Sequence, residues 1–287
     1  MRNPKKSPSL NAGFAEAKAI TGHSAKTFYS ASHFLPKEKR YAAYIVYAVC
    51  RASDDAVDIN ISSPAQSLSR IKENIAAVYS DESINRQLLL ALRKTVKDYG
   101  VPKEYFDEFI AGMQMDLSKR RYKNFGELYD YSYKAAGVIG LIMLEIFDRH
   151  NEEAKDYAVA LGIAMQLTNI IRDIKEDYLR GRIYLPAQEM EKFAVSETDI
   201  SRGIMNESLK RLLEFQVRRA RQYYTDSEKG IKMIHDARCR FVVRAMKEMY
   251  EAQLDEIEKN DYNVFSKRAC VNGFKKTGIL LKILLCR

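Results

Sequence analysis

The sequence predicts an all-α protein that forms a single domain. Only 13 glycines and 6 prolines occur in 287 residues, whereas sheet proteins need frequent turns. Apolar residues recur at helical spacing through most of the chain, and no stretch shows the alternation of a half-buried strand. No linker or internal repeat divides the sequence. We therefore expect a flexible segment over residues 1–12 and one helical domain over 13–287.

Prolines and one glycine indicate where several helices begin and end. Pro36, Pro64 and Pro102 fit the first turn of a helix, and Gly100 fits a C-terminal cap. The segment 181–186 (GRIYLP) interrupts the helical pattern. The expected helices cover residues 14–32, 36–58, 65–79, 84–99, 102–121, 125–148, 152–177, 205–228, 231–259 and 262–285.

The expected helix over 125–148 contains the small residues of AAGVIG. Gly137 and Gly140 each cost roughly 1 kcal/mol of helix stability relative to alanine. This cost is compensated only where another helix or a ligand approaches closely.

Asp54 and Asp58 lie one helical turn apart in YAVCRASDDAVD. On a helix their carboxylates share one face, with Cβ atoms roughly 5–6 Å apart. The preceding residues 41–50 are mostly apolar and fit a buried helix, so these like charges need a nearby cation. A divalent cation is the simplest candidate.

A second set of oxygen ligands lies in QLTNIIRDIKED. Asn169, Asp173 and Asp177 follow one another at four-residue steps and form one stripe along a helix. Magnesium prefers oxygen ligands and commonly binds through few carboxylates together with substrate phosphates. A solvated helix face explains either set alone about as well. Both sets together, each with an adjacent arginine, favour a magnesium–diphosphate site.

Basic residues near the two sets suit a diphosphate that develops negative charge as it leaves. Arg51 precedes Asp54 by three residues, Arg172 directly precedes Asp173, and Arg182 lies in the loop after the second set. Lys26, between the hydroxyls of Ser24 and Thr27, fits a second phosphate. For Lys26 or Arg182 alone, a surface salt bridge explains the charge equally well.

Ionisation of an allylic diphosphate leaves a carbocation, so the site needs a dry, apolar cavity. The helix over 125–148 suits one wall, and aromatic residues suit others, although such residues more often form plain core. The candidate aromatic residues are Phe28, Tyr29, Tyr44, Tyr47, Tyr133 and Tyr250.

Composition argues against several other classes. Four widely spaced cysteines and four scattered histidines form no metal-ligand pattern, and no GxSxG, P-loop or GxGxxG motif is present.

The N-terminus lacks the apolar core of a signal peptide, which favours the cytoplasm. The net charge of +9 suits phosphorylated substrates, an anionic membrane surface or nucleic acid. The apolar, basic end of the chain, residues 278–287, fits a helix docked on the body or one that contacts a membrane surface.

These motifs resemble those of the squalene/phytoene synthases, a family of head-to-head prenyl transferases. The resemblance runs from AKTFYSASHFLP through YAVCRASDDAVD, GMQMDLSKRRYKNFGELYDYSYKAAGVIG and QLTNIIRDIKED to GRIYLP and YNVFSKRA. It implies the all-α isoprenoid synthase fold, with helices around a central apolar cavity. One departure is SAKT (24–27), where many relatives have HSKS, which affects the hydrogen bonding of one diphosphate.

The resemblance also implies roles for individual residues. Magnesium ligands would be Asp54, Asp58, Asn169, Asp173 and Asp177, of which the four aspartates are the catalytic residues. Substrate contacts would be Ser24, Lys26, Thr27, Tyr47, Arg51, Gln166, Arg172, Arg182, Tyr250 and Arg268.

The implied reaction couples two farnesyl or geranylgeranyl diphosphates through a cyclopropyl diphosphate intermediate. Proton loss then gives dehydrosqualene or phytoene, whereas reduction by NADPH gives squalene. The segment MDLSKRRYKNFGEL and the RIYLP loop favour the carotenoid precursors.

Two further alternatives remain. A phosphatase that hydrolyses prenyl diphosphate would need the metal site without an acceptor site. A basic helical protein that binds nucleic acid or an acidic partner would gather its arginines on an exposed face. Because two arginines adjoin buried carboxylates, we do not expect a nucleic-acid partner.

Overall fold

The computed structural model describes residues 9–58 and 63–285, with residues 56–58 described by their backbone only. Within these ranges the chain is helical and contains no strand; one isolated bridge joins Arg121 and Ile183. The first helices are α1 (Leu10–Ser24), α2 (Lys26–Ser32), α3 (Lys37–Asp58), α4 (Pro64–Tyr79), α5 (Gln87–Tyr99), α6 (Lys103–Ser118) and α7 (Phe125–Ser132). The others are α8 (Val138–Asp148), α9 (Lys155–Arg172), α10 (Ile174–Leu179), α11 (Ala187–Lys192), α12 (Glu197–Ser201), α13 (Glu207–Met233), α14 (Ala237–Lys259) and α15 (Gly273–Leu285). A short 3₁₀ turn, Glu152–Ala154, precedes α9.

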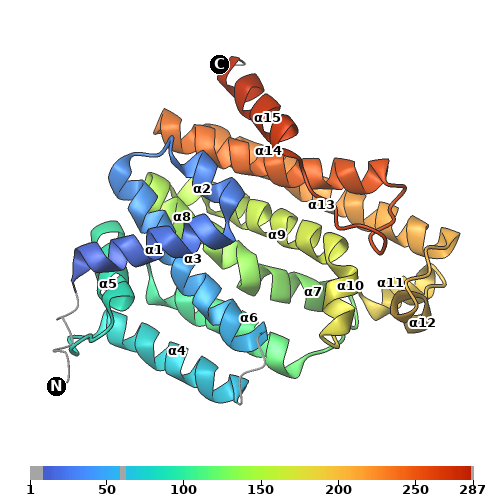
Figure 1. Ribbon diagram of the computed structural model, residues 1–287, viewed down its shortest axis with the longest axis horizontal. Helices are drawn as coiled ribbons and strands as arrows, with labels where there is room; N and C mark the ends of the chain where they lie inside the picture. The colour runs from blue at the N-terminus through green and yellow to red at the C-terminus, as the bar shows by residue number, and fades with distance from the viewer. Residues whose placement is uncertain (1–8, 59–62, 286–287) are drawn as a thin grey trace.

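Helices α3 and α9 run through the middle of the bundle (Figure 1). Helix α3 packs against α1, α4, α5, α6 and α8, and α9 packs against α8, α13 and α14. The two helices that carry the predicted acidic sets are therefore both surrounded by other helices.

Two groups of buried apolar side chains hold the bundle together. One is built around α3, where Ala43, Ile45 and Val46 are completely buried. The other lies between α9 and α13 and includes Ile171 and Leu213. Full burial of an isoleucine or leucine contributes roughly 1.5–3 kcal/mol. Both central helices are thus fixed by core packing on several sides.

The helix boundaries correct several sequence predictions; for example, α13 ends at Met233 instead of residue 228, and α11 and α12 were not expected. Helix α1 begins at Leu10, inside the segment 1–12 that was expected to be flexible, because the Ser9 hydroxyl accepts from the Ala12 N–H at 3.2 Å. Residues 1–8 lie outside the described part of the chain. The expected helix 14–32 breaks at Ala25, which has ψ of 58°. The expected helix 152–177 breaks at Asp173, and the last helix begins at Gly273 instead of residue 262. Gly100 has φ of 65° and caps α5 as predicted.

Helices α7 and α8 are joined by one π-helical turn, Tyr133–Gly137. The Val138 N–H donates to the Tyr133 carbonyl, five residues back instead of four. Such turns are rare and occur frequently at functional sites. The expected helix 125–148 is therefore continuous, with one wider turn in its middle.

Candidate active site

A cavity of about 1110 Å³ lies inside the bundle. Its wall comes from α1, α2, α3, α6, the α7–α8 segment, α9, α10, α13, α14, the segment before α15 and the first turn of α15. Every predicted site residue whose side chain the structure describes lines this cavity. These residues are Ser24, Lys26, Thr27, Tyr47, Arg51, Asp54, Gln166, Asn169, Arg172, Asp173, Asp177, Arg182, Tyr250 and Arg268.

Helix α3 contributes Tyr47, Arg51 and Asp54 to the wall. Arg51 Nη2 pairs with Asp55 Oδ1 at 2.6 Å, one helical turn later. Asp55, which the sequence analysis did not select, therefore orients the arginine that was predicted to contact a diphosphate. Asp58 closes α3, but its side chain lies outside the described part of the structure.

The residues of the second set stay on one side of the chain although the helix breaks between α9 and α10. The Asp173 N–H donates to the Asn169 carbonyl at 2.8 Å, and the Asp177 N–H donates to the Asp173 carbonyl at 2.8 Å. Helical backbone hydrogen bonds, from each N–H to the carbonyl four residues earlier, thus continue through the break. As a result Asn169, Asp173 and Asp177 all reach the cavity.

Asp173 is held between two guanidinium groups. Arg172 Nε lies 2.7 Å from Asp173 Oδ1, and Arg268 binds both carboxylate oxygens at 2.7 and 2.9 Å. Burial raises the pKa of Asp173, but the hydrogen bonds from Arg172 and Arg268 outweigh it and lower the pKa below its ordinary value. This carboxylate stays ionised at neutral pH.

Asp177 has the opposite electrostatic environment. Burial, followed by repulsion from Asp173, raises its pKa to about 7, although Arg180 and Arg182 act to lower it. A positive charge beside Asp177 would favour the ionised form. This end of the stripe is therefore suited to a cation.

Cationic and hydroxyl groups around the carboxylates could hold phosphate oxygens. Arg182 is almost fully buried, and its backbone N–H donates to the backbone carbonyl of Asp177 at 2.9 Å. The next residue, Ile183, donates to the Arg120 carbonyl at 3.0 Å, which fixes the 181–186 loop against the cavity. Thr27 Oγ1 accepts from Lys276 Nζ at 2.7 Å.

The remaining wall is mostly apolar. It is lined by Met113, Ala135, Ala136, Ile139, Gly140, Met143, Leu144, Phe147, Ala158, Leu161, Gly162, Met165, Val243, Met246 and Met249. Phe28, Tyr47 and Tyr250 also line the cavity, as expected. Tyr29, Tyr44 and Tyr133 do not line it; they pack into the core instead. For these three, the sequence could not separate an apolar helix face that packs from one that faces a cavity.

Two glycines allow α9 to approach the π-turn and α8. A Cβ on Gly162 would lie 2.3 Å from the Ala136 carbonyl oxygen, and a Cβ on Gly140 would lie 2.3 Å from that of Ala158. Of the two predicted reasons for small residues in this segment, another helix or a ligand, the close approach of a helix is confirmed at Gly140.

We expect Gly162→Ala to lower the free energy of unfolding by roughly 1–3 kcal/mol, because the added methyl group meets backbone that cannot rotate away. Urea unfolding followed by circular dichroism measures this change. Gly278→Ala is the matched control, since its Cβ meets nothing within 4 Å and alanine is the better helix former. A Gly162→Ala protein as stable as the wild type would contradict the packing.

The sequence analysis missed a buried cluster in the cavity wall. Asp116 Oδ1 accepts from Tyr184 Oη at 2.7 Å, and its Oδ2 accepts from Tyr131 Oη at 3.0 Å. All three residues line the cavity. The available signal was the position of Asp116, three residues after Met113 and seven after Phe109, on the apolar face of the helix 102–121. Arg180, Gln253 and Lys276 were also missed, and nothing in their local sequence distinguishes them from surface residues.

Comparison with known proteins agrees with this geometry. Residues 21–275 match the squalene/phytoene synthase family. The chain is 37% identical to the phytoene synthase of Arthrospira platensis, over 90% of this chain and 88% of that protein. It is 35% identical to the 15-cis-phytoene synthase of Synechococcus elongatus, over 93% of this chain and 91% of that protein.

Solved structures show the same fold. A dehydrosqualene synthase in complex with a ligand superposes with a TM-score of 0.91 at 27% identity, covering 96% of this chain and 97% of that chain. A squalene synthase from Alicyclobacillus acidocaldarius superposes with a TM-score of 0.82 at 26% identity, covering 88% and 96%.

The fold and the cavity are those of an all-α prenyltransferase, as predicted. This chain belongs to the squalene/phytoene synthase family. It is an enzyme of head-to-head prenyl diphosphate condensation, which confirms the predicted class of reaction.

Proposed function

We propose that this enzyme condenses two molecules of geranylgeranyl diphosphate to phytoene. The observation that carries the proposal is one cavity lined both by carboxylates and arginines and by many apolar side chains. The choice of a C40 product is supported by the curated relatives, which are phytoene synthases at 35% and 37% identity over nine tenths of the chain. Farnesyl diphosphate, leading to dehydrosqualene, is the alternative substrate.

Enzymes of this family generally depend on a divalent metal. The donor set here suits Mg²⁺, because Asp54, Asn169, Asp173 and Asp177 all offer oxygen atoms to the same cavity. Within the described residues no cluster of three or more metal-ligating His, Cys, Asp or Glu side chains is assembled, so substrate oxygens would complete the coordination. Bound magnesium would neutralise the diphosphate as it departs.

The protein's own residues have three tasks in this proposal. Arg172, Arg182 and Arg268 hold the departing diphosphate, to which a guanidinium can donate two parallel hydrogen bonds. The apolar wall keeps water away from the allylic cation and from the cyclopropylcarbinyl cation that follows. The aromatic faces of Phe28, Tyr47 and Tyr250 stabilise positive charge near them.

Incubation of the purified enzyme with Mg²⁺ and either geranylgeranyl or farnesyl diphosphate tests the proposal. We expect phytoene from the C20 substrate without NADPH, and no product when EDTA replaces Mg²⁺. Extraction and chromatography of the hydrocarbon give the chain length. Dehydrosqualene as the preferred product would overturn the choice of substrate, and squalene formed only with NADPH would overturn proton loss as the last step. Release of prenyl alcohol alone would contradict condensation.

Because prenyl diphosphates are amphiphilic lipids, we also propose that the enzyme works in contact with a membrane surface.

A further inference from the structure

Helix α15 docks on the bundle through one face only. Ile283 is 8% exposed, and Ile279 and Leu280 pack against the apolar core around α3 and α14. The helix contacts α14, and its C-terminal end projects away from the bundle (Figure 1). Docking on the bundle explains why the inward face of α15 is apolar, but it does not explain the residues on the outward face.

The outward face of α15 is apolar. Phe274 is 93% exposed, Leu281 53% and Leu285 84%. Their spacing of seven and four residues places them on one stripe of a helix with 3.6 residues per turn. Exposed apolar side chains that form a continuous stripe, unlike scattered ones, indicate an interaction surface.

The charge of α15 is entirely positive. Its sequence, GFKKTGILLKILL, contains three lysines and no acidic residue. Lys275 pairs with Glu256 at 2.8 Å, whereas Lys282 forms no ion pair within the described residues. Two copies of this helix placed face to face would bring like charges together. Lys276 donates to Thr27, so Lys282 is the lysine that accompanies the apolar stripe, and the two together complement an anionic lipid surface.

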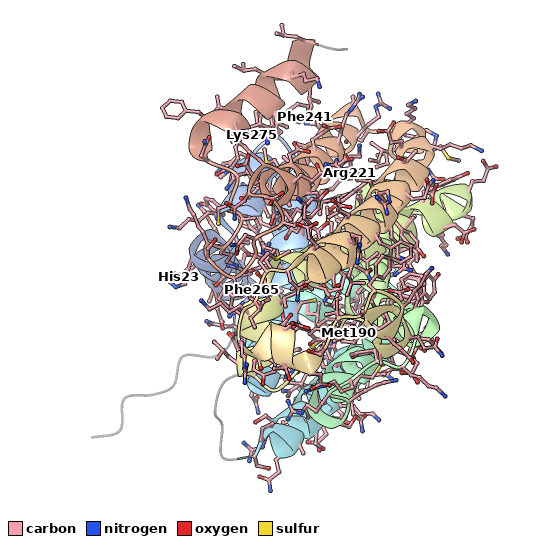
Figure 2. The ribbon with its side chains drawn as sticks, turned by 90° about the vertical axis from the view of Figure 1, so that its right-hand side faces the viewer. His23, Met190, Arg221, Phe241, Phe265 and Lys275 are labelled. Carbon is pink, nitrogen blue, oxygen red and sulfur yellow. The ribbon has the colours of Figure 1, made fainter. Side chains whose placement is uncertain are left out.

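The segment that leads into α15 also forms part of the cavity wall. Arg268 and Val271 precede α15 and Lys276 lies in its first turn; all three line the cavity, and Lys276 donates to Thr27 of α2. Figure 2 shows Lys275 at the base of α15, where the helix meets the bundle. A lipid surface that α15 binds would therefore lie close to the rim of the active-site cavity.

We propose that α15 binds in the plane of an anionic lipid bilayer and holds the rim of the cavity against it. Thirteen residues extend about 20 Å, less than the ~30 Å apolar thickness of a bilayer. Among the described residues, no helix is long and apolar enough to cross a membrane. Phe274, Leu281 and Leu285 enter the interface, and Lys282 contacts lipid headgroups. The inference deepens the proposed function, whose substrate would enter from the same bilayer.

Co-sedimentation of the full-length enzyme with vesicles tests this inference. We expect binding to vesicles of phosphatidylglycerol and phosphatidylcholine, and weaker binding at high salt because the lysine contribution is screened. The triple variant Phe274→Ser, Leu281→Ser and Leu285→Ser should bind at least about tenfold more weakly, because three apolar side chains no longer leave water. Lys282→Glu should weaken binding to anionic vesicles only.

Ile204→Ser is the matched control, because Ile204 is 41% exposed but lies in the turn before α13. It should bind vesicles like the wild type. Failure of the wild type to sediment would overturn the inference, and so would equal binding by the triple variant. A dimer in analytical ultracentrifugation that the triple variant abolishes would identify a second copy as the occupant instead.

The assay contains no substrate, so its outcome is independent of the proposed function. Product formation is measured separately with substrate in detergent micelles, where the triple variant should equal the wild type. A wild type that forms no phytoene there counts against the function, whereas a loss of vesicle binding counts against the role of α15.

Discussion

Asp173→Asn is expected to lower the rate of product formation by at least about 1000-fold. The substitution removes a carboxylate charge from the middle of the Asn169–Asp173–Asp177 stripe, where the proposed magnesium site needs it. It also leaves Arg172 and Arg268 without the carboxylate that now orients them. Steady-state turnover with saturating Mg²⁺ measures the loss.

Glu197→Gln provides a matched control for this substitution. Glu197 accepts from Arg121 Nε at 2.7 Å and from Nη2 at 2.8 Å, the same two-bond geometry that joins Arg268 to Asp173. Glu197 does not line the cavity. Loss of an exposed arginine–carboxylate pair should leave turnover unchanged. Near-normal turnover in Asp173→Asn, with the helical circular dichroism retained, would contradict the metal and diphosphate assignment.

Asp116→Leu is expected to lower the free energy of unfolding by about 3–5 kcal/mol. The Tyr131 and Tyr184 hydroxyls are buried, and both donate to this carboxylate. An apolar replacement removes the carboxylate acceptor of both hydroxyls and leaves Tyr131 only its longer contact to Tyr184 Oη at 3.3 Å; loss of an acceptor costs roughly 1–3 kcal/mol for each buried donor. Urea unfolding of the variant measures the loss.

Removal of the tyrosine hydroxyls separates this explanation from a simple packing defect. The triple variant Asp116→Leu, Tyr131→Phe and Tyr184→Phe takes away the donors together with their acceptor. It should recover about 2 kcal/mol or more relative to Asp116→Leu, because no hydroxyl is then buried without a partner. If the triple variant is no more stable than Asp116→Leu, the hydrogen bonds contribute little at this site.

The fold class and most of the candidate site could be predicted because they depend on local spacing. A four-residue step sets the face of a helix, so Asn169, Asp173 and Asp177 could be placed together without a structure. Prolines and Gly100 mark helix ends through backbone restrictions that also act locally. The predicted family and all-α architecture are confirmed, whereas the roles of the individual site residues stay predictions.

Features that depend on distant contacts could not be predicted in the same way. Arg268 reaches Asp173 from 95 positions later in the chain, and Asp116 meets Tyr184 from 68 positions away. Nothing local specifies such partners. The break at Ala25 separates two segments with ordinary helix propensity, so it too depends on packing.

The π-turn at Tyr133–Gly137 has a consequence for how this family can tolerate insertions and deletions. A π-turn contains one residue more than an α-turn, so it absorbs that residue and keeps α7 and α8 in the phase of one continuous helix. Deleting one residue within the turn would restore an ordinary α-turn, and Gly140 would stay against Ala158 while Tyr131 stayed at Asp116. Deleting a second residue would leave nothing to absorb the change and would rotate α8 by about 100°, which takes Gly140 away from Ala158. Among homologues, a one-residue difference in this segment should therefore be tolerated far better than any longer change.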